Sequence, residues 1–420
     1  MPGALDTRQP ATAWRRNVAA VTAASFMGYT GFTLAMPFLP LYIGQLGVSD
    51  IGEIAMWTGA SLAVTPALTA LLAPAWGRLG DRFGLKLMVE RSLVSFVIIM
   101  AAMAYVTRAW HVLALRLVQG VFAGYGSLSL TMAAESAPRR ELASAIGLVQ
   151  TAQRLGPAVG PVIGGVLAGL VGLRHAFLVT SAFYAVALLC VIVLYDERLT
   201  HAAPADTKET GRVTFRNVLA FENFILMMAV IFALQFVDRS LGPVLPLYVE
   251  VSGIAHSRVP VISGILFSIM ACAGAVGHHI CGRLLHRFPA RSVITTGVSA
   301  AAASSVLFAL AANVAAMSVA ALLVGIGIGA ATTAAYSAAG GAIPEGAQGA
   351  GFGILTSASL VGMASSPFIA GFLSGTSIRF VFVVNVALMV LVAVTVENTM
   401  VDTPGDHTGQ ALRHAEDERP

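Results

Sequence analysis

The chain has 420 residues, of which 57% are hydrophobic and only 11% are charged. A soluble domain carries about 25% charged residues, so the composition excludes a water-soluble globular protein of this size. Apolar runs of about 20 residues, each long enough to cross a bilayer, recur along the whole chain. They begin near residues 18, 54, 87, 110, 143, 175, 218, 260, 291, 314, 348 and 379. The sequence therefore predicts an all-α membrane protein with twelve transmembrane helices.

The positions of the basic residues predict the orientation of the chain. With a cytoplasmic N-terminus, eighteen of the 25 Lys and Arg residues fall in inside loops and tails, four in outside loops and three within spans. Because Lys and Arg accumulate in cytoplasmic loops, we expect a multi-pass protein of the cell (inner) membrane with both termini in the cytoplasm. No small-residue cleavage pattern follows the first run, which is therefore expected to be an uncleaved span.

A mixed-charge stretch between the sixth and seventh spans predicts how the chain is divided. It runs from Asp196 to Asn217 and is the longest polar stretch inside the chain. We expect an N-terminal six-helix bundle over residues 1–198, a cytoplasmic linker over 199–217, a C-terminal six-helix bundle over 218–400 and a cytoplasmic tail over 401–420.

The two halves match each other at a nearly constant offset. Residues 37–42 (PFLPLY) correspond to 243–248 (PVLPLY), displaced by 206, and residues 77–79 (GRL) recur at 282–284, displaced by 205. A third match, also displaced by 206, pairs Gly147, Gly156, Pro161 and Gly165 with Gly353, Gly362, Pro367 and Gly371. The sequence therefore predicts two parallel repeats of six helices, a relation known between the halves of major facilitator transporters.

Three motifs carry a resemblance to that superfamily. Residues 77–86 (GRLGDRFGLK) resemble its signature between helices 2 and 3, and Arg116 with Gln119-Gly120 is similar to its helix-4 motif. Residues 147–165 (GLVQTAQRLGPAVGPVIGG) resemble the helix-5 motif associated with antiporters. The resemblance covers residues 15–400 and is closest to the twelve-helix drug:proton antiporter branch. It implies the major facilitator fold and a secondary active transporter that exports drugs or amphipathic small molecules in exchange for protons by alternating access.

The first motif is expected to form a tight cytoplasmic turn, because its glycines, among them Gly77 and Gly84, permit one. The resemblance implies a gate in which Asp81 engages a neighbouring helix terminus and charged partners, with Arg82 in the same motif. A well-anchored loop without a gating role is the alternative interpretation.

The helix-5 motif sorts its residues onto two faces. At about 100° per residue, Gly156, Gly160 and Gly164 form one stripe on which a neighbouring helix can approach closely. Arg154 lies on nearly the opposite face. The residues expected to form a gating interface are Gly147, Gly156, Gly160, Pro161, Gly164 and Gly165, and tight packing alone is the alternative.

Polar residues inside the spans are the candidates for coupling. Asp238, in the middle of the seventh span, is the candidate proton-coupling acid, because desolvation raises the pKa of a carboxyl group toward neutrality. A static ion pair with Arg239 or Arg154 is the alternative. Arg154 has Leu360 at its repeat position, so its charge is present in one half only. For Arg116 the resemblance implies a role in proton transfer, and an arginine that snorkels to the interface or ties helices together is the alternative.

The substrate cavity is expected to be lined by polar and aromatic residues of the spans. The candidates are Tyr29, Thr33, Gln150 and Gln235. No acidic residue occurs between Val18 and Gly44, which weakens the case for cationic substrates. The expected partners are a small-molecule substrate, protons and the lipid bilayer, with no nucleic acid, and the chain is expected to be a monomer.

Enzymatic function is not predicted, because neither a Walker sequence nor an HExxH pattern occurs. The three cysteines show no paired spacing, so no disulfide framework, metal site or cofactor is expected. Two other functions remain open: a facilitator or proton-coupled transporter of a specific metabolite such as a sugar or organic acid, and a non-transporting membrane receptor on a transporter fold.

Overall fold

The computed structural model describes residues 13–138, 141–197, 223–311, 313–343 and 348–400, and these residues form helices joined by short connections. The expected linker and cytoplasmic tail, residues 199–217 and 401–420, lie outside this part of the chain. Two compact units are present. Unit 1 contains Met1–Lys208, Ser240–Ala271 and Pro367–Ile378, and unit 2 contains Glu209–Arg239, Cys272–Ser366 and Arg379–Pro420. The expected division into two sequential six-helix bundles stays a prediction.

The helices begin close to the positions that the apolar runs predict. The first half holds α1 (Ala13–Ala35), η1 (Met36–Phe38), α2 (Leu39–Gln45), α3 (Ile51–Phe83), α4 (Leu85–Met103), α5 (Ala109–Phe122), α6 (Tyr125–Ser136), α7 (Leu142–Val171) and α8 (Leu173–Leu194). The second half holds α10 (Phe224–Val251), η4 (His256–Arg258), α11 (Val259–Leu285), α12 (Ala290–Leu310), α13 (Val314–Ala342), α14 (Gln348–Ser374) and α15 (Ile378–Thr399).

Within the described residues, eleven helical segments are long and apolar enough to cross a membrane. Three of them combine helices: α1, η1 and α2 form one, α5 with α6 forms another, and η4 with α11 forms the third. The twelfth span is α4, a helix of 19 residues whose charged residues Lys86, Glu90 and Arg91 all lie in its first two turns. The structure therefore confirms the prediction of an all-α protein with twelve membrane-spanning segments.

The connection between α3 and α4 differs from the turn expected over residues 77–86. Helix α3 continues through Phe83, and only Gly84 separates it from α4. Gly84 adopts φ 90° and ψ 143°, a conformation that L side chains rarely adopt. The expected tight turn is therefore present, but it is confined to Gly84, because residues 77–83 extend the helix.

The fourth span is broken in its middle, which the sequence analysis did not predict. Helix α5 ends at Phe122, and α6 begins at Tyr125 after Gly124 with φ 123°. The guanidinium of Arg91 in α4 donates to the carbonyls of Phe122 and Ala123, at 3.1 and 3.2 Å, and its Cζ lies 3.4 Å from the centroid of the Trp76 ring. The carbonyls freed by the break are therefore satisfied by a side chain of the neighbouring helix.

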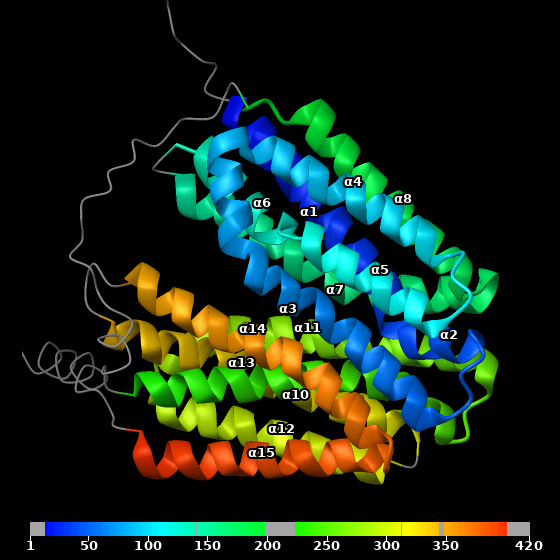
Figure 1. Cartoon of the computed structure of the whole chain (residues 1–420). Helices are drawn as coiled ribbons and strands as arrows, with labels where there is room; N and C mark the ends of the chain where they lie inside the picture. Colours follow the sequence, from blue (N-terminus) through cyan, green and yellow to red (C-terminus); the bar gives the residue numbers. More distant parts are fainter. Residues whose placement is uncertain (1–12, 139–140, 198–222, 312, 344–347, 401–420) are drawn as a thin grey trace, which may run out of the picture. The chain divides into compact units, whose positions relative to one another are not determined.

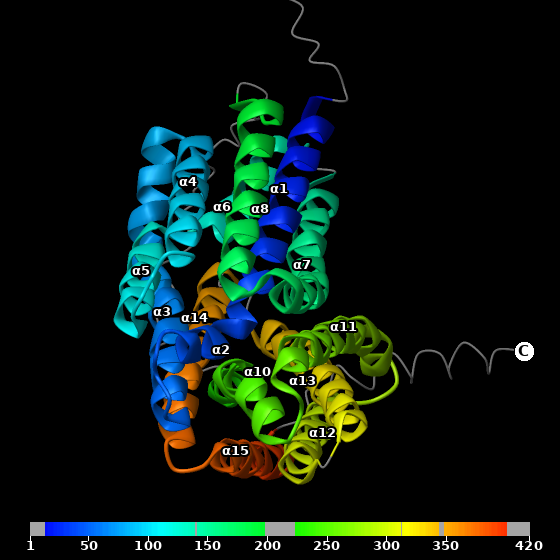
Figure 2. The ribbon, with the colours of Figure 1, turned by 90° about the vertical axis from the view of Figure 1, so that its right-hand side faces the viewer.

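In unit 1, α1 is the central helix of the first six spans. It packs against α7 and α8, and α8 packs against α4. Figure 1 shows α1, α4 and α8 running side by side, and Figure 2 shows α1 between α7 and α8. Aromatic pairs fill this part of the core: the rings of Tyr42 and Phe177 lie 4.8 Å apart, and those of Phe96 and Tyr184 lie 5.2 Å apart. These buried aromatic residues thus pack α8 against α2 and α4.

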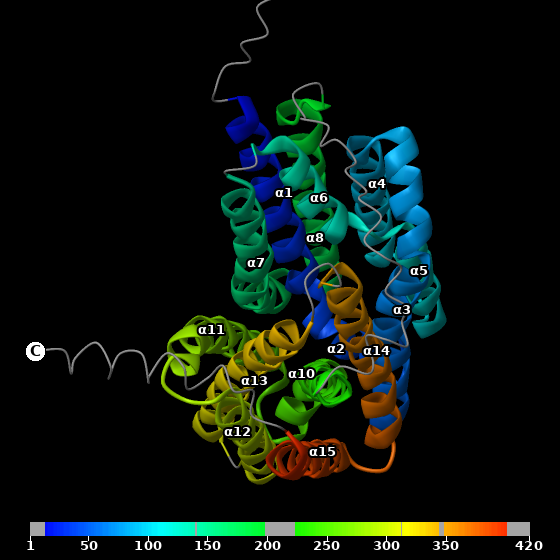
Figure 3. The same cartoon turned by 90° about the vertical axis from the view of Figure 1, so that its left-hand side faces the viewer.

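In unit 2, α12 and α13 form the closest helix pair, and they lie side by side in Figure 3. Gly297 and Gly327 face each other across this pair, so that a Cβ added to Gly327 would meet the carbonyl oxygen of Gly297 at 2.5 Å. Helix α15 joins α12 through the stacked rings of Phe308 and Phe382, whose centroids are 5.7 Å apart. Close packing through small residues is therefore a feature of both units.

Candidate functional site

The glycine stripe of α7 packs directly on α1. A Cβ added to Gly156 would lie 2.7 Å from the amide nitrogen of Thr30, and one added to Gly164 would lie 2.7 Å from the carbonyl carbon of Leu34. Both distances are shorter than real Cβ contacts. Gly160 faces Thr33 in the same way. The structure confirms the close helix approach that the i, i+4 spacing predicts.

Thr33, an expected cavity residue, takes part in this packing. Its hydroxyl donates to the carbonyl of Tyr29 at 2.8 Å within α1 and to the carbonyl of Gly156 at 3.2 Å across to α7. A buried hydroxyl whose donor is satisfied by backbone carbonyls stabilises a helix pair. The structure thus places Thr33 at the junction of α1 and α7.

Two pairs of glycine contacts within unit 1 repeat one another. A Cβ added to Gly264 of α11 would lie 3.0 Å from the carbonyl carbon of Pro161 of α7, and one added to Gly165 would lie 3.2 Å from that of Pro260. The same relation joins α3 and α14: a Cβ on Gly59 would lie 2.9 Å from the carbonyl carbon of Pro367, and one on Gly371 would lie 3.0 Å from that of Ala55. The residues that correspond in the two pairs are separated by 205 or 206 positions, so the internal duplication is visible in the contacts.

These contacts separate the roles of the motif's residues. Gly156, Gly160 and Gly164 hold α7 against α1, whereas Pro161 and Gly165 meet α11 of the second repeat. Around Gly147 there is open space, because an added Cβ meets no atom within 4 Å. Only part of the motif is therefore a packing surface.

Arg116 is sealed inside unit 1. Its side chain is 1% exposed, its Nε donates to the carbonyl of Ser61 at 3.1 Å, and its Nη1 donates to Oε1 of Gln119. The guanidinium carbon lies 5.6 Å from the centroid of the Phe32 ring, and Thr65 donates to the carbonyl of Arg116 at 2.7 Å. The pairing of Arg116 with Gln119 joins two residues of the helix-4 motif within α5, and the hydrogen bonds with Ser61 and Thr65 tie α5 to α3.

Arg154 and Gln150 have the opposite environment. Both side chains are exposed, and neither has a hydrogen-bonding or ion-pair partner among the described residues. Arg154 is the thirteenth of the 30 residues of α7, so it lies well inside the span. A charge in this position requires water or a ligand, because its transfer to lipid costs about 2.5–3.5 kcal/mol on insertion scales.

In unit 2, Asp238 forms an ion pair with its neighbour in sequence. Oδ2 of Asp238 lies 3.2 Å from Nε of Arg239, and the two side chains are 35% and 49% exposed. The ion pair that the sequence analysis kept as an alternative is therefore present. Gln235, three residues earlier, packs its β-carbon toward Gly362 of α14.

Tyr29 lies near Tyr125 and Gly126 of α6. The two tyrosine rings are 6.4 Å apart, and the hydroxyl of Tyr29 occupies the space beside Gly126. Gln153 of α7 also reaches this helix, since its amide donates to the carbonyl of Gly126 at 3.1 Å. Aromatic and polar side chains thus gather where α1, α6 and α7 meet.

The end of unit 1 where α8 finishes is held by polar contacts to α1 and α4. Lys86, in the motif of residues 77–86, donates to the carbonyl of Tyr195 at 2.8 Å, and Asn17 exchanges hydrogen bonds with the backbone of Asp196 at 2.8 and 3.0 Å. The carboxylate of Glu197 lies against Gly84, where an added Cβ would meet its Oε1 at 2.6 Å. The motif therefore contacts the end of α8 through Lys86 and Gly84.

Tyr195 itself is buried in this cluster. Burial raises the pKa of Tyr195 to about 12, the hydrogen bond with Ser136 lowers it, and the nearby carboxylates of Glu135 and Glu197 raise it further. The phenol is therefore protonated at physiological pH. Of the other residues of the motif, Gly77 and Asp81 lie within α3, but their surroundings are outside the described part of the structure, and Arg82 is exposed.

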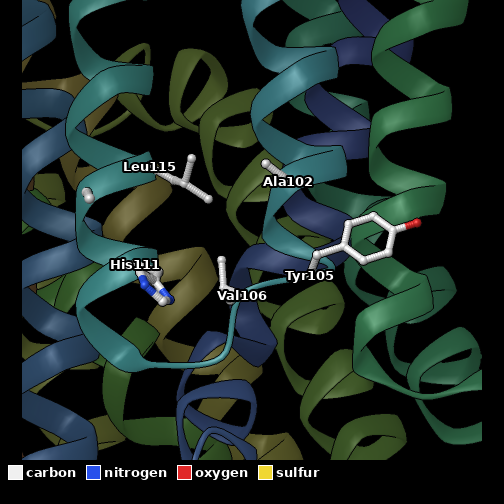
Figure 4. A pocket seen from close by; sticks show the side chains of 6 residues that line it. Ala102, Tyr105, Val106, His111 and Leu115 are labelled. Carbon is white, nitrogen blue, oxygen red and sulfur yellow. The ribbon is translucent and has the colours of Figure 1, made fainter.

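A hollow of about 390 Å³ lies beside the connection from α4 to α5 (Figure 4). It is lined by Ala102, Tyr105, Val106, His111, Ala114 and Leu115. None of the residues predicted for coupling or substrate binding lines it, and four of its six lining residues are aliphatic.

The sequence profile of the Major Facilitator Superfamily matches residues 21–321 and 280–416. The chain belongs to this superfamily. Its members are transporters rather than enzymes, and the fold described above is theirs. The duplicated contacts of Gly264 and Gly59 follow from the two parallel repeats of this superfamily.

Curated relatives extend over most of the chain. A multi-drug resistance efflux pump PmrA homolog from Lactococcus lactis subsp. lactis (strain IL1403) is 27% identical over 380 residues, which cover 90% of this chain and 93% of the relative. The multidrug resistance protein MdtG of Proteus mirabilis (strain HI4320) is 29% identical over 288 residues, 68% of this chain and 71% of the relative.

Among solved structures, a bacterial homolog of the human lysosomal transporter Spinster has a TM-score of 0.76 at 15% identity. The alignment covers 94% of this chain and all of that one. At this identity the likeness concerns the fold.

Proposed function

We propose that this superfamily member exports drugs or other amphipathic small molecules in exchange for protons. The observation that carries the proposal is the complete helix-5 motif on α7, whose glycines and prolines meet both α1 and α11. A transporter that alternates between two states needs helices that approach closely and separate again, and contacts without side chains suit this. The two relatives named for multidrug resistance support the substrate class.

Proton coupling is assigned to Asp238, with Arg239 as its partner. The carboxylate of Asp238 is 35% exposed and lies 3.2 Å from Nε of Arg239, so a change at this carboxyl group would change its ion pair. Arg116, fully enclosed between Ser61 and Gln119, is assigned the role of tying α5 to α3, so that it supports the site without exchanging protons itself.

The orientation and the assembly belong to the same proposal. Both termini face the cytoplasm, since eighteen of the 25 Lys and Arg residues then lie inside. The chain acts as a monomer in the cell membrane. The gate is formed by the segment 77–86. The candidate substrate contacts are Tyr29 and Gln150 in unit 1 and, separately, Gln235 in unit 2.

Transport in everted membrane vesicles tests the proposal. Ethidium should enter everted vesicles whose interior is more acidic than the medium. Its entry should dissipate the pH gradient in proportion to the amount of this protein in the membrane. Uptake that is unchanged after a protonophore abolishes the gradient contradicts proton coupling and supports a facilitator. Vesicles in which neither ethidium nor any other multidrug probe moves contradict the export of drugs.

A transporter of one defined metabolite is the second candidate. The observation that favours it is the lack of an acidic residue between Val18 and Gly44, which weakens the case for cationic drugs. Competition separates the two candidates: a multidrug exporter is inhibited by chemically unrelated amphipaths, whereas a metabolite transporter is inhibited only by relatives of its substrate.

A further inference from the structure

The charges deep within the spans of unit 1 are all positive. Arg116 lies at the eighth of the 14 positions of α5, and Arg154 at the thirteenth of the 30 positions of α7. The described carboxylates of unit 1 lie in the first two turns of a helix, in its last turn or just outside it: Asp50, Glu53, Glu90, Glu135, Glu141, Asp196, Glu197 and Glu250. No described carboxylate of unit 1 therefore compensates the two arginines at mid-span.

The two arginines differ in what they can bind. Arg116 is 1% exposed and donates to Ser61 and Gln119, so it contributes a positive potential without an open donor face. Arg154 is exposed, and no described residue accepts a hydrogen bond from it. Its guanidinium is a planar donor fork that fits a carboxylate, sulfonate or phosphonate with two parallel hydrogen bonds.

The neighbours of Arg154 on α7 leave room for a ligand. Gln150, one turn before it, is exposed and offers an amide that donates two hydrogen bonds. Gly147, one turn further, has open space where a side chain would be. We call Gly147, Gln150 and Arg154 the α7 polar face. It combines a free charge, a free amide and open space, and it occurs once in the chain because Arg154 and Gln150 have Leu360 and Thr356 at their repeat positions.

We propose that the α7 polar face recognises the anionic head group of an amphipathic organic acid, and that the transporter prefers such anions to cations of similar shape. The transport part of this inference rests on the proposed function, whereas the binding of the anion does not. Arg154 receives the head group in two hydrogen bonds, and Gln150 adds a third. A cation at this face would meet the guanidinium of Arg154 and no described carboxylate of unit 1 at mid-span.

Binding of two matched probes to the purified full-length chain tests the inference. The anion is 8-anilinonaphthalene-1-sulfonate, and the neutral analogue is N-phenyl-1-naphthylamine, which has the same aromatic body without the sulfonate. The affinity of each probe is obtained from the rise in the unfolding temperature with probe concentration. Unfolding is monitored by size-exclusion chromatography, so that probe fluorescence does not interfere. The wild-type chain should bind the sulfonate at least about 10-fold more tightly than the analogue.

Variants of Arg154 locate the interaction. Arg154→Gln should weaken sulfonate binding by about 10- to 100-fold, the usual effect of losing a charge-assisted hydrogen bond, and should leave binding of the neutral analogue unchanged. Arg154→Lys keeps the charge but not the planar donor fork. Its affinity for the sulfonate should therefore lie between those of the wild type and Arg154→Gln. Arg108→Gln, which removes an exposed guanidinium at the start of α5, should bind both probes like the wild type.

The outcomes separate this inference from the proposed function. Sulfonate binding by the wild type that is no tighter than binding of the neutral analogue overturns the inference, as does an Arg154→Gln affinity within twofold of the wild type. Selective sulfonate binding without any probe-driven proton flux in proteoliposomes supports the inference and contradicts proton-coupled export. Ethidium-driven proton flux without a preference for the sulfonate supports export and contradicts the inference.

Discussion

Gly264 of α11 lies against the carbonyl group of Pro161 of α7, so closely that an added Cβ would be 3.0 Å from the carbonyl carbon. Pro161 follows Gly160 in the helix-5 motif, and Gly264 is the repeat counterpart of Gly59, which meets Pro367 in the same way. The helix-5 motif thus contacts Gly264 of the second repeat, a residue that does not belong to any of the three motifs. Because backbone meets backbone here, the contact tolerates no side chain on the glycine.

Replacing Gly264 should disturb this contact specifically. Gly264→Ala should lower the apparent unfolding temperature, because forcing a methyl group into a packed contact costs about 1–3 kcal/mol, and Gly264→Leu should reduce transport by at least about 10-fold on the same grounds. The transport rate of Gly264→Leu is measured as ethidium uptake by everted vesicles, normalised to the amount of folded protein.

Gly282→Ala on the same helix is the matched control for this pair. An added Cβ at Gly282 meets no atom within 4 Å, and alanine in a helix is about 0.5–1 kcal/mol more favourable than glycine. It should therefore leave transport unchanged and stability equal or slightly higher. Equal effects of alanine at positions 264 and 282 would contradict a role for the close contact.

Arg91 should be important for stability, because it satisfies the carbonyls at the break between α5 and α6 and stacks on Trp76. Arg91→Met should destabilise the protein by about 2–4 kcal/mol through loss of the hydrogen bonds and the cation–π contact. Arg91→Lys, which keeps the charge but replaces the planar guanidinium by an ammonium group, should lose less stability than Arg91→Met. Apparent thermal unfolding in detergent measures both, and an Arg91→Met variant that unfolds with the wild type would refute this account.

Asp238→Asn should abolish proton-driven transport, because the amide keeps the size of the carboxylate and its hydrogen bonding to Arg239 but has no titratable proton. Transport down a substrate gradient without a pH gradient should persist. Glu250→Gln is the control: this carboxylate lies near the end of α10 and contacts His256 at 2.8 Å. Retention of a full pH-gradient response in Asp238→Asn vesicles would assign coupling to another group.

The orientation can be checked with protease sites introduced at the two ends of the chain. Sites placed before Trp14 and after Asp402 should be resistant in intact cells and cleaved in everted vesicles, since the distribution of Lys and Arg puts both ends inside. A site in the connection between α4 and α5, next to Arg108, should show the reverse pattern. Cleavage of one terminus but not the other in intact cells would require an odd number of spans.

Several features of the fold were predicted correctly because they depend on local sequence. Length and continuity of the apolar runs determine where helices cross a bilayer, and the observed helices begin within a few residues of the predicted positions. The i, i+4 spacing of Gly156, Gly160 and Gly164 predicts a close helix approach whatever the partner. The break at Gly124 was missed, because a glycine in a span does not by itself differ from the glycines that remain helical.

By itself the sequence determined the membrane class, the twelve spans, the duplication and the superfamily, since hydropathy, spacing and offset are properties of the chain as written. Only the tertiary structure decided which faces meet. It pairs Pro161 with Gly264, buries Arg116 with Gln119, and leaves Arg154 exposed without a partner among the described residues. The physical reason is that a charge within a span must be satisfied, and whether a carbonyl, an amide or an external ligand does so depends on residues far away in sequence.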